Sequence, residues 1–519
     1  MKKTKIFLTI SFAFGLLFTA CELTEDPKFL ASDNLFSDVV GANTVLNGVY
    51  ASLNDFSYYG ADYHHLLNFA SGMYNSNRDA TLKDIGAMNP PANLNFVTNV
   101  WRVTFQTISR ANNLLSGLSG VELADAAEQD NIMGQAYFLR SLSYFNLVRI
   151  YGKCPLIIEP VTSDNPYAAM ADPNDIYTQI IKDAEMAEQL LPEKGSETLG
   201  RPAKTAANML LAKVYMQLAG GQTAGQTDNW QKAYDEAIKV YGRHSLVSDF
   251  ASLWQPETSN NTSESIFEVQ GNIENTLRLF QLWTPSNGYA GRNSWGRFKS
   301  NLEVYDNHVN TYPNDPRIQY TFVTEWTKFL ANGNTQIQKT YPDFTKRNNK
   351  DKSYPWNYKF FNKDINSDNY NTDQNFIVFR YADLLLMLAE IENELNGPEN
   401  AYQYVDEVLA RARVAGGASS DQPANWSEMD QEQFRERIMF EYNFELLNEL
   451  HEYFNNRRRG YDWFKKHVIE AHNNHPGYDF SKPRDILYPD NPRIMVMPIP
   501  EDELSANPKM SGTDQNSGY

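Results

Sequence analysis

The sequence GQAYFLRSLSYFNLVRIYGKCP, residues 134–155, decides the fold class. Apolar residues recur through it at helical spacing and also fill positions between, so most of the helix surface would be apolar. A helix of this kind is buried among other helices instead of lying on a protein surface. Gly152 supplies a helix stop, and Pro155 prevents the helix from resuming. The stretch therefore predicts a central helix in a mainly α-helical protein.

Length and composition indicate an ordinary globular protein. The chain has 519 residues, of which 42% are hydrophobic and 21% are charged, and this length can enclose a large core. Its net charge is −18 and its sequence pI is near 5.0, and no basic stripe offsets that charge. Because so acidic a surface repels nucleic-acid phosphates, nucleic acid is not expected as a partner.

Aromatic residues are abundant, at 13% of the chain. Large aromatic side chains contribute much of the buried area of protein cores, so a well-packed core is the favoured interpretation. The other interpretation is that some Trp and Tyr side chains lie in loops and serve as stacking platforms for a ligand. Composition leaves both open.

The N-terminus has the layout of a secretion signal. Three lysines precede a largely apolar segment over residues 6–20, which is too short for a comfortable membrane span. Small residues lead into Cys21 and resemble a bacterial lipobox, in which the signal is cut before the cysteine and the thiol is lipidated. We therefore expect a signal peptide over residues 1–20, lipidation at Cys21, and a short tether over residues 21–32.

The two cysteines of the chain indicate neither a disulfide framework nor a metal cluster. If Cys21 carries lipid, Cys154 has no partner within the chain. Cys154 has no histidine beside it in a recognisable motif, so we expect it to be a packed, small apolar residue instead of a nucleophile. No metal and no cofactor are expected.

Helical periodicity recurs along the chain. An amphipathic helix is expected over residues 39–53, capped by Ser37 or Asp38. Further helices are expected over residues 93–118, 175–191, 200–220, 230–241, 376–397 and 399–413. The last four form two pairs, which suggest tetratricopeptide-like hairpins. Residues 57–94 and 250–372 are rich in aromatic and turn-forming residues and are expected to be largely irregular.

Several motifs carry a resemblance to a known family. The sequence AYFLRSLSYFNLVRIYGKCPLI (136–157) resembles the signature helix of the SusD/RagB family of Bacteroidetes outer-membrane lipoproteins, with Ser141 in place of Ala. Three other stretches resemble further motifs of that family, namely WRVTFQTISRANNLL (101–115), RYADLLLMLAE (380–390) and IMVMPIPEDELSANPKM (494–510). The motifs follow the family order over essentially the whole chain.

The resemblance implies a mainly α-helical fold. About four tetratricopeptide-like helical hairpins would form one body, and a loop-rich part would be inserted between them. The chain would then be a single domain over residues 33–519, with its irregular, ligand-binding part mainly in residues 57–94 and 250–372. Within this scaffold the stretch 134–155 identifies the fold, and nothing in it indicates a ligand site.

One region departs from the family pattern. Family members carry a Glu-rich helix that ends Glu-Gly-x-Arg-x-x-Asp-x-x-Arg. Residues 440–458 keep three glutamates in phase and the arginines at 457–459, but the expected Gly, Arg and Asp are replaced. The replacements are Leu450, Glu452 and Asn455. We therefore expect a rewired buried charge network at this place.

The resemblance also implies a function. Family members bind oligosaccharides, or peptides in some branches, and cap a SusC-like TonB-dependent transporter at the outer membrane. Sugar rings stack on Trp and Tyr, and Asn, Asp and Arg bind the hydroxyl groups. Residues 74–79 and 282–297 combine these side chains, and Gly288, Gly291 and Gly296 are expected to hold the second stretch open. The candidate ligand-binding residues are Asn77, Arg78, Asp79, Trp283, Tyr289, Arg292 and Trp295.

The same aromatic residues have an alternative role. Trp283, Tyr289 and Trp295 could equally pin a long loop to the body, and Trp326 and Trp356 are weaker ligand candidates. The leading hypothesis is a lipid-anchored protein on the outside of the outer membrane that captures oligosaccharide or polysaccharide and passes it to the transporter. The alternatives are a transporter lid or assembly partner with weak ligand affinity, and a peptide-binding member of the family.

An enzyme is the least favoured class. The sequence has no Gly-x-Ser-x-Gly elbow, P-loop or nucleotide-binding Gly motif. His64 and His65 are adjacent, so on regular structure they would not converge on one metal, and a solvated loop is expected there. A glycosidase carboxylate pair is defined by distance in space and is not identifiable among 64 acidic residues. No catalytic residue is assigned.

Overall fold

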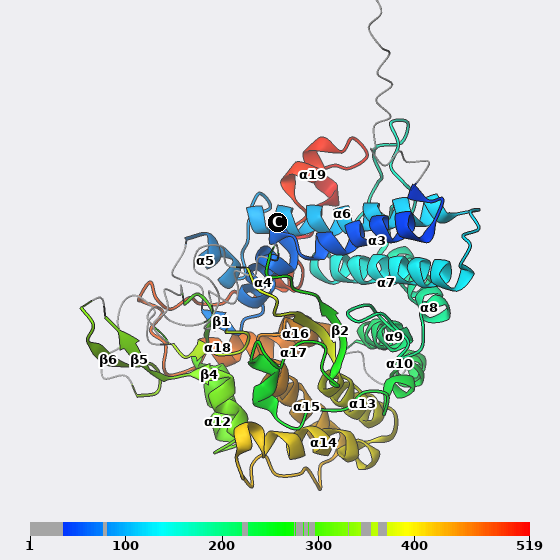
Figure 1. The fold of residues 1–519 in the computed structure, drawn as a ribbon. Coiled ribbons are helices and arrows are strands. Elements are labelled where there is room, and N and C mark those ends of the chain that lie inside the picture. The colour runs from blue at the N-terminus through cyan, green and yellow to red at the C-terminus, as the bar shows by residue number, and fades with distance from the viewer. Residues whose placement is uncertain are drawn as a thin grey trace, which may run out of the picture.

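The computed structural model describes residues 35–75, 80–220, 227–274, 276, 284, 289, 296–330, 332–343, 354–361 and 371–519. Figure 1 shows long helices arranged in an arc, from α6 and α7 through α8, α9 and α10 to α13 and α14. Short strands and irregular segments fill the opposite side, where the hairpin of β5 and β6 projects from the body. The mainly α-helical fold predicted from the sequence is confirmed.

The N-terminal helices follow the predicted periodicity. Helix α3 (Val39–Leu53) begins after Asp38, whose side chain accepts a hydrogen bond from the Gly41 amide. Helix α6 (Asn95–Leu118) packs against both α3 and α7 (Ala126–Tyr151). Helix α8 (Pro173–Leu190) covers another side of α7. Helix α7 is therefore enclosed by neighbouring helices, as the apolar stretch predicted.

Two helix pairs form the rest of the arc. Helix α9 (Lys204–Ala219) pairs with α10 (Thr227–Val240), and α13 (Tyr381–Asn396) pairs with α14 (Tyr402–Ala412). Helix α10 also packs against α13, which joins the two hairpins. Both predicted pairs are present.

The start of the second pair was wrongly predicted. Residues 376–380 form strand β8 (Phe376–Arg380), which pairs antiparallel with β2 (Ser265–Val269), and the helix begins only at Tyr381. All five residues of each strand are buried. A short apolar run that is buried on both faces has no alternation, so periodicity does not distinguish it from a buried helix.

The segment expected to be irregular over residues 57–94 is largely helical. It contains a π-helical turn (Phe56–Gly60), α4 (Asp62–Ala70) and α5 (Ala80–Gly86). Every residue of α4 is buried, so the helix has no polar face and gives no amphipathic signal. The expectation of a solvated loop at His64 and His65 is wrong for the same reason, because both side chains are buried in α4.

The described part of residues 250–372 holds helix α12 and most of the short strands, and β1 lies earlier in the chain. A four-stranded sheet has the order β1–β3–β7–β4, and β5 pairs with β6 in a hairpin. The strands are β1 (Tyr74–Asn75), β3 (Lys299–Ser300), β4 (Phe322–Val323), β5 (Glu325–Phe329), β6 (Thr335–Lys339) and β7 (Trp356–Asn357). The 3-10 helices are η2 (Phe250–Trp254) and η4 (Pro316–Tyr320), and α12 (Leu302–Thr311) was not predicted.

The C-terminal part completes the body. Helix α15 (Gln431–Leu446) and α16 (His451–Arg458) replace the single Glu-rich helix expected over residues 440–458. The remaining helical segments are η5 (Pro398–Asn400), η6 (Ala415–Gly417), α17 (Tyr461–Phe464), η7 (Lys465–Glu470), α18 (Ala471–Asn473), η8 (Pro492–Met495), α19 (Glu501–Ala506) and η9 (Gly512–Asp514). The Met497 amide donates to the carbonyl of Ile150 at 2.7 Å, which ties the C-terminus to the end of α7.

Within the described ranges, no helix is both long enough and apolar enough to cross a membrane. The expected signal peptide, Cys21 and the tether lie in residues 1–34, outside the described residues.

Candidate ligand-binding site

The sheet places the described beginning of one expected ligand-binding stretch beside the strand that follows the other. The first stretch, residues 74–79, begins in β1, and the second, residues 282–297, ends just before β3. Strands β1 and β3 are antiparallel partners, with Tyr74 opposite Ser300 and Asn75 opposite Lys299. The two stretches are distant in sequence, but their described ends lie side by side.

Among the candidate ligand residues, Tyr289 lies in the described part of the chain. Its ring makes an edge-to-face contact with Phe361, with ring centroids 5.1 Å apart, and it packs against an aromatic cluster formed by Val323, Trp326 and Trp356. Burial raises the pKa of Tyr289 to about 12. Tyr289 therefore packs against the body, and its part in ligand binding stays a prediction.

The two tryptophans of the aromatic cluster pack against each other inside the protein. Trp326 and Trp356 are buried, and their rings meet edge to face at 6.1 Å. Gly296 has φ +57°, and a Cβ there would lie 2.2 Å from a ring carbon of Trp356. Gly296 is therefore required for the close approach of the Trp356 ring, whereas the sequence suggested that it only keeps a loop open.

The other six candidate ligand-binding residues all lie outside the described residues. These are Asn77, Arg78, Asp79, Trp283, Arg292 and Trp295. Their assignment to a ligand site stays a prediction.

The β5–β6 hairpin carries an exposed apolar pair that sequence reasoning missed. Phe329 is 53% exposed and Ile337 is 61% exposed. Thr327 lies opposite Ile337 and Phe329 lies opposite Thr335, so both apolar side chains occupy the same face of the hairpin. The Asn-Gly sequence at 332–333 was a hairpin signal that could have located them.

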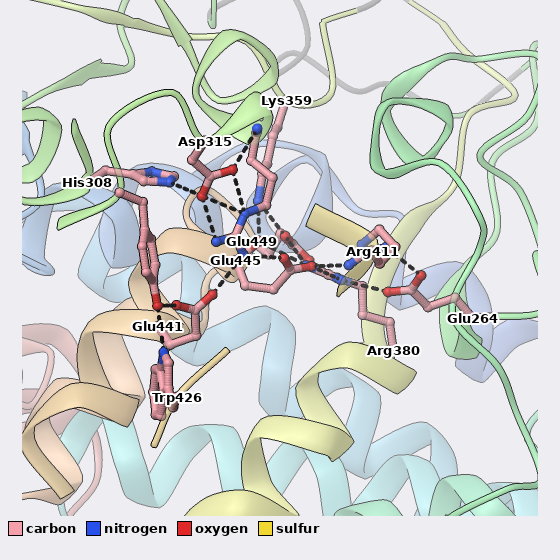
Figure 2. Close-up of polar contacts among 12 residues, drawn as sticks. Glu264, His308, Asp315, Lys359, Arg380, Arg411, Trp426, Glu441, Glu445 and Glu449 are labelled. Carbon is pink, nitrogen blue, oxygen red and sulfur yellow. Dashed lines mark hydrogen bonds and ion pairs between the residues drawn. The ribbon is translucent and has the colours of Figure 1, made fainter. Parts of the chain in front are cut away.

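A buried network of charges lies between α15 and the strand–helix junction at Arg380 (Figure 2). Arg380 donates to Glu264 at 2.7 Å, and it also binds Glu445 and Glu449. Arg411 binds Glu264 at 3.0 Å and Glu445 as well. These side chains are all nearly or completely buried.

The network continues on the other side of Glu445. Arg317 donates to Glu441 and Glu445 at 2.8 Å each and to Asp315 at 2.7 Å. Lys359 donates to Glu449 at 2.7 Å. Asp315 also contacts the His308 ring at 2.9 Å. A buried charge network in this region was expected, and it is confirmed.

The chemistry of this network is structural. Burial alone would raise the pKa of Glu445, but Arg411, Arg380 and Arg317 outweigh it and hold the pKa at about 2. Each carboxylate is matched by a cation, and the set is closed to solvent. The network therefore locks β2, β8 and α15 together and presents no reactive group to a substrate.

Metal ligation and thiol chemistry are the two other possibilities that the described residues allow to be tested. No group of three or more His, Cys, Asp or Glu side chains within the described ranges is placed to hold a metal ion. Cys154 is fully buried, and burial raises the pKa of its thiol, so the thiolate needed for nucleophilic chemistry is disfavoured.

A largely apolar hollow lies between α12, α15 and α17. Its lining includes Phe440 and Phe444 of α15, with Asn307 and Asn443 as polar groups. Trp463 and His467 stack at 3.8 Å beside it, and burial lowers the pKa of His467 to about 4. The imidazole is therefore neutral at pH 7.

Comparison with known proteins gives relatives over the whole chain. A family model described as "SusD family" matches residues 217–519, and one described as "Starch-binding associating with outer membrane" matches residues 31–216. SusD-like protein P25 of Formosa agariphila is 27% identical, over 96% of this chain and 97% of that protein. SusD-like protein P2 of the same organism is 26% identical over the full length of both.

Solved structures agree in fold. A SusD homologue from Bacteroides thetaiotaomicron has a TM-score of 0.76 at 20% identity, covering 94% of this chain and 98% of that one. A laminarin-binding SusD-like protein has a TM-score of 0.70 at 23% identity, covering 93% and 100%. Because the first family model alone matches more than half of the sequence, this chain belongs to the SusD family.

Proposed function

We propose that the protein is a cell-surface lipoprotein that captures oligosaccharides and delivers them to a SusC-like TonB-dependent transporter. The observation that carries this proposal is the family membership, which extends through both family models from residue 31 to residue 519. One structural relative binds laminarin, so glycan recognition is compatible with this scaffold. The protein would act by binding and not by catalysis.

The pairing of β1 with β3 supports a ligand site made by the two neighbouring stretches. Tyr289 would anchor the second stretch on the aromatic cluster. Trp283 and Trp295 would then be available to stack on sugar rings, and Asn77, Arg78, Asp79 and Arg292 would bind hydroxyl groups at the ring edges.

Titration of the soluble chain from residue 22 against a panel of polysaccharides, laminarin included, tests the proposal. Trp283→Ala and Trp295→Ala are each expected to weaken binding about tenfold, which corresponds to about 1.4 kcal/mol. Tyr167→Ala is the control, because Tyr167 is an exposed aromatic side chain on the connection between α7 and α8. Unchanged affinity in both Trp variants would remove these stretches as the site.

The anchoring proposal has a separate test. Cys21→Ser is expected to release the protein from the outer membrane into the soluble fraction, because the lipid-bearing thiol is lost. Protease treatment of intact cells should degrade the unmodified protein if it faces the exterior. A variant that stays with the membrane would contradict lipid anchoring at Cys21.

A role mainly as transporter lid is the second candidate, and it is favoured by the exposed pair Phe329 and Ile337. Apolar side chains of this size on a projecting hairpin suit contact with a partner protein. In this case a Phe329→Ser and Ile337→Ser double variant would lose co-purification with the transporter, while glycan titrations of the unmodified protein would be flat.

A further inference from the structure

Two adjoining hollows lie among α7, α9, α16 and β8, at a distance in sequence from the loops discussed above. Their empty volumes, open mouths included, are about 370 Å³ and 290 Å³. Both are lined by Arg149, Lys213 and Phe454, so we treat them as one cleft and name it the Arg149 cleft.

Arg149 lines both hollows and is held by two aromatic rings and two hydrogen bonds. Its guanidinium lies between the rings of Phe145 and Phe454, 3.7 Å and 3.6 Å from their centroids. Its Nε donates to the Phe145 carbonyl at 3.1 Å, and its Nη2 donates to the Asn146 side-chain oxygen at 2.7 Å. Both faces of the guanidinium are therefore covered, and only its edge is open to a ligand.

Arg149 has N–H groups that make no hydrogen bond with the described residues. A guanidinium has five N–H groups, and two are used by Phe145 and Asn146. The other three have no acceptor among the residues that the structure describes, and none of those residues places a carboxylate within ion-pair distance of Arg149. Burial lowers the pKa of Arg149 to about 10, so the group remains a cation at pH 7.

The other charged groups lining the cleft are already matched. Lys213 pairs with Asp383 at 2.6 Å. Glu449 pairs with Arg380 and Lys359, and Arg458 pairs with Glu390. Burial lowers the pKa of His451 to about 4 despite the nearby Asp383, so this imidazole is neutral. The cleft therefore keeps one uncompensated positive charge.

Arg149 differs from the arginines of the buried network. The net charge is −18, and Arg317, Arg380 and Arg411 all bind carboxylates in the buried network. Burying part of an unpaired cation away from water costs free energy, and a bound anion lowers that cost by pairing with the cation. The open edge of a guanidinium matches the two oxygens of a carboxylate or sulfate group.

We propose that the Arg149 cleft binds an oxyanion, a carboxylate or a sulfate group, through the open edge of the Arg149 guanidinium. Lys213, paired with Asp383, and the tyrosines Tyr59 and Tyr63 line the same space. The anion is either free in solution or carried by a small acidic sugar. This proposal does not depend on the glycan-capture function, because it concerns a different part of the molecule.

Calorimetric titration of the chain from residue 22 tests it. The probes are sodium sulfate and sodium glucuronate, with sodium chloride at equal ionic strength and neutral glucose as references. Saturable binding of sulfate or glucuronate is expected, and Arg149→Met should weaken it about tenfold or more. Arg201→Met is the matched control, because Arg201 also stacks on an aromatic ring, that of Tyr50 at 3.9 Å, but lies outside the cleft.

The pattern of binding identifies the source of the anion. Binding of sulfate without glucuronate supports a free anion, and tighter binding of glucuronate supports an acidic sugar. Equal affinities of the unmodified protein and Arg149→Met, or no saturable binding of either probe, would overturn the proposal. Loss of polysaccharide binding in Trp283→Ala with unchanged anion binding would separate this site from the loop site.

A second measurement needs no variant, in case Arg149→Met does not fold. Crystals soaked in sodium selenate, an isostere of sulfate, are expected to show an anomalous peak within hydrogen-bond distance of Arg149 Nη1 or Nη2. A soaked crystal without a peak at Arg149 would contradict the proposal.

Discussion

Leu450 adopts a backbone conformation that most residues avoid. It has φ +70° and ψ 4°, in the left-handed region, and immediately precedes α16. The family pattern described above has Gly at this position, and Gly adopts this conformation without steric cost. Leu450 is 5% exposed, so its side chain contributes buried apolar area in return for the strain.

At Leu450 a glycine variant should therefore be more stable than an alanine variant, the reverse of the order within a helix. Leu450→Ala and Leu450→Gly both lose the buried side chain, which costs about 2–4 kcal/mol. Leu450→Gly also relieves the strain, so it should be more stable than Leu450→Ala by about 1 kcal/mol. Urea unfolding measures both. Leu446, buried at the end of α15, is the control, because there Gly should be less stable than Ala.

Glu445 is the residue on which the buried network depends. Arg317, Arg380 and Arg411 all donate to its carboxylate. Glu445→Gln would leave these buried cations without adequate compensation and should lower the free energy of unfolding by about 3–5 kcal/mol. Glu432→Gln, on the exposed side of the same helix, should change it by about 1 kcal/mol or less.

The same carboxylate predicts a pH dependence. The pKa of Glu445 is about 2 in the folded protein, below its ordinary value of 4.5. Its contribution to stability is therefore complete above about pH 4.5 and is lost as the pH falls towards 2. The stability difference between the unmodified protein and Glu445→Gln should shrink over this interval in urea unfolding. A constant difference down to pH 2 would contradict the low pKa.

At the scale of single elements, α7 shows how a glycine fixes a helix end. Gly152 caps this helix with φ +76°, and its amide donates to the Val148 carbonyl. Beside this turn, the Met497 amide donates a hydrogen bond to the Ile150 carbonyl in the last turn of the helix. The local sequence alone indicated this end correctly.

Replacing a glycine with alanine should have opposite effects on stability at two positions. Gly152→Ala forces a side chain into the positive-φ conformation, with a Cβ 3.3 Å from Val496, and should lower the free energy of unfolding by about 1–2 kcal/mol. Gly48→Ala lies within α3, where a Cβ meets no neighbour within 4 Å, and should raise stability by up to about 1 kcal/mol. Thermal unfolding of the two variants compares them. Equal effects would contradict the conformational argument.

At the scale of the whole molecule, the boundary between the two family models is not a boundary in the packing. It falls at residues 216 and 217, inside α9. Helix α9 packs against both α8 and α10, and the C-terminal segment returns to α7. Side chains from both parts form one hydrophobic core.

The two parts should therefore unfold together. Far-ultraviolet circular dichroism and tryptophan fluorescence are expected to give coincident thermal transitions for the chain from residue 22. A fragment of residues 31–216 should lack cooperative unfolding, because it leaves the faces of α7 and α9 that contact later helices exposed to water. Two separate transitions, or a cooperatively folded fragment, would contradict a shared core.

The sequence by itself determined the features that depend on neighbours along the chain. Helical periodicity located α3, α6 and α8, the glycine at 152 located the end of α7, and the family motifs identified the scaffold. These signals are local, because a helix face or a capping residue is defined within a few positions.

The tertiary structure decided what depends on burial and on partners distant in sequence. Strand β8 and helix α4 are buried on all sides, so no polar face revealed which structure each would adopt. The arginine at 380 and the arginine at 149 are both preceded by apolar residues. The first meets glutamates from residues 264, 445 and 449, and the second meets none in the part of the chain that the structure describes. Only folding brings an arginine and glutamates from distant positions together. The sequence of the α7 stretch therefore did not show that the arginine at 149 lacks a carboxylate partner among the described residues.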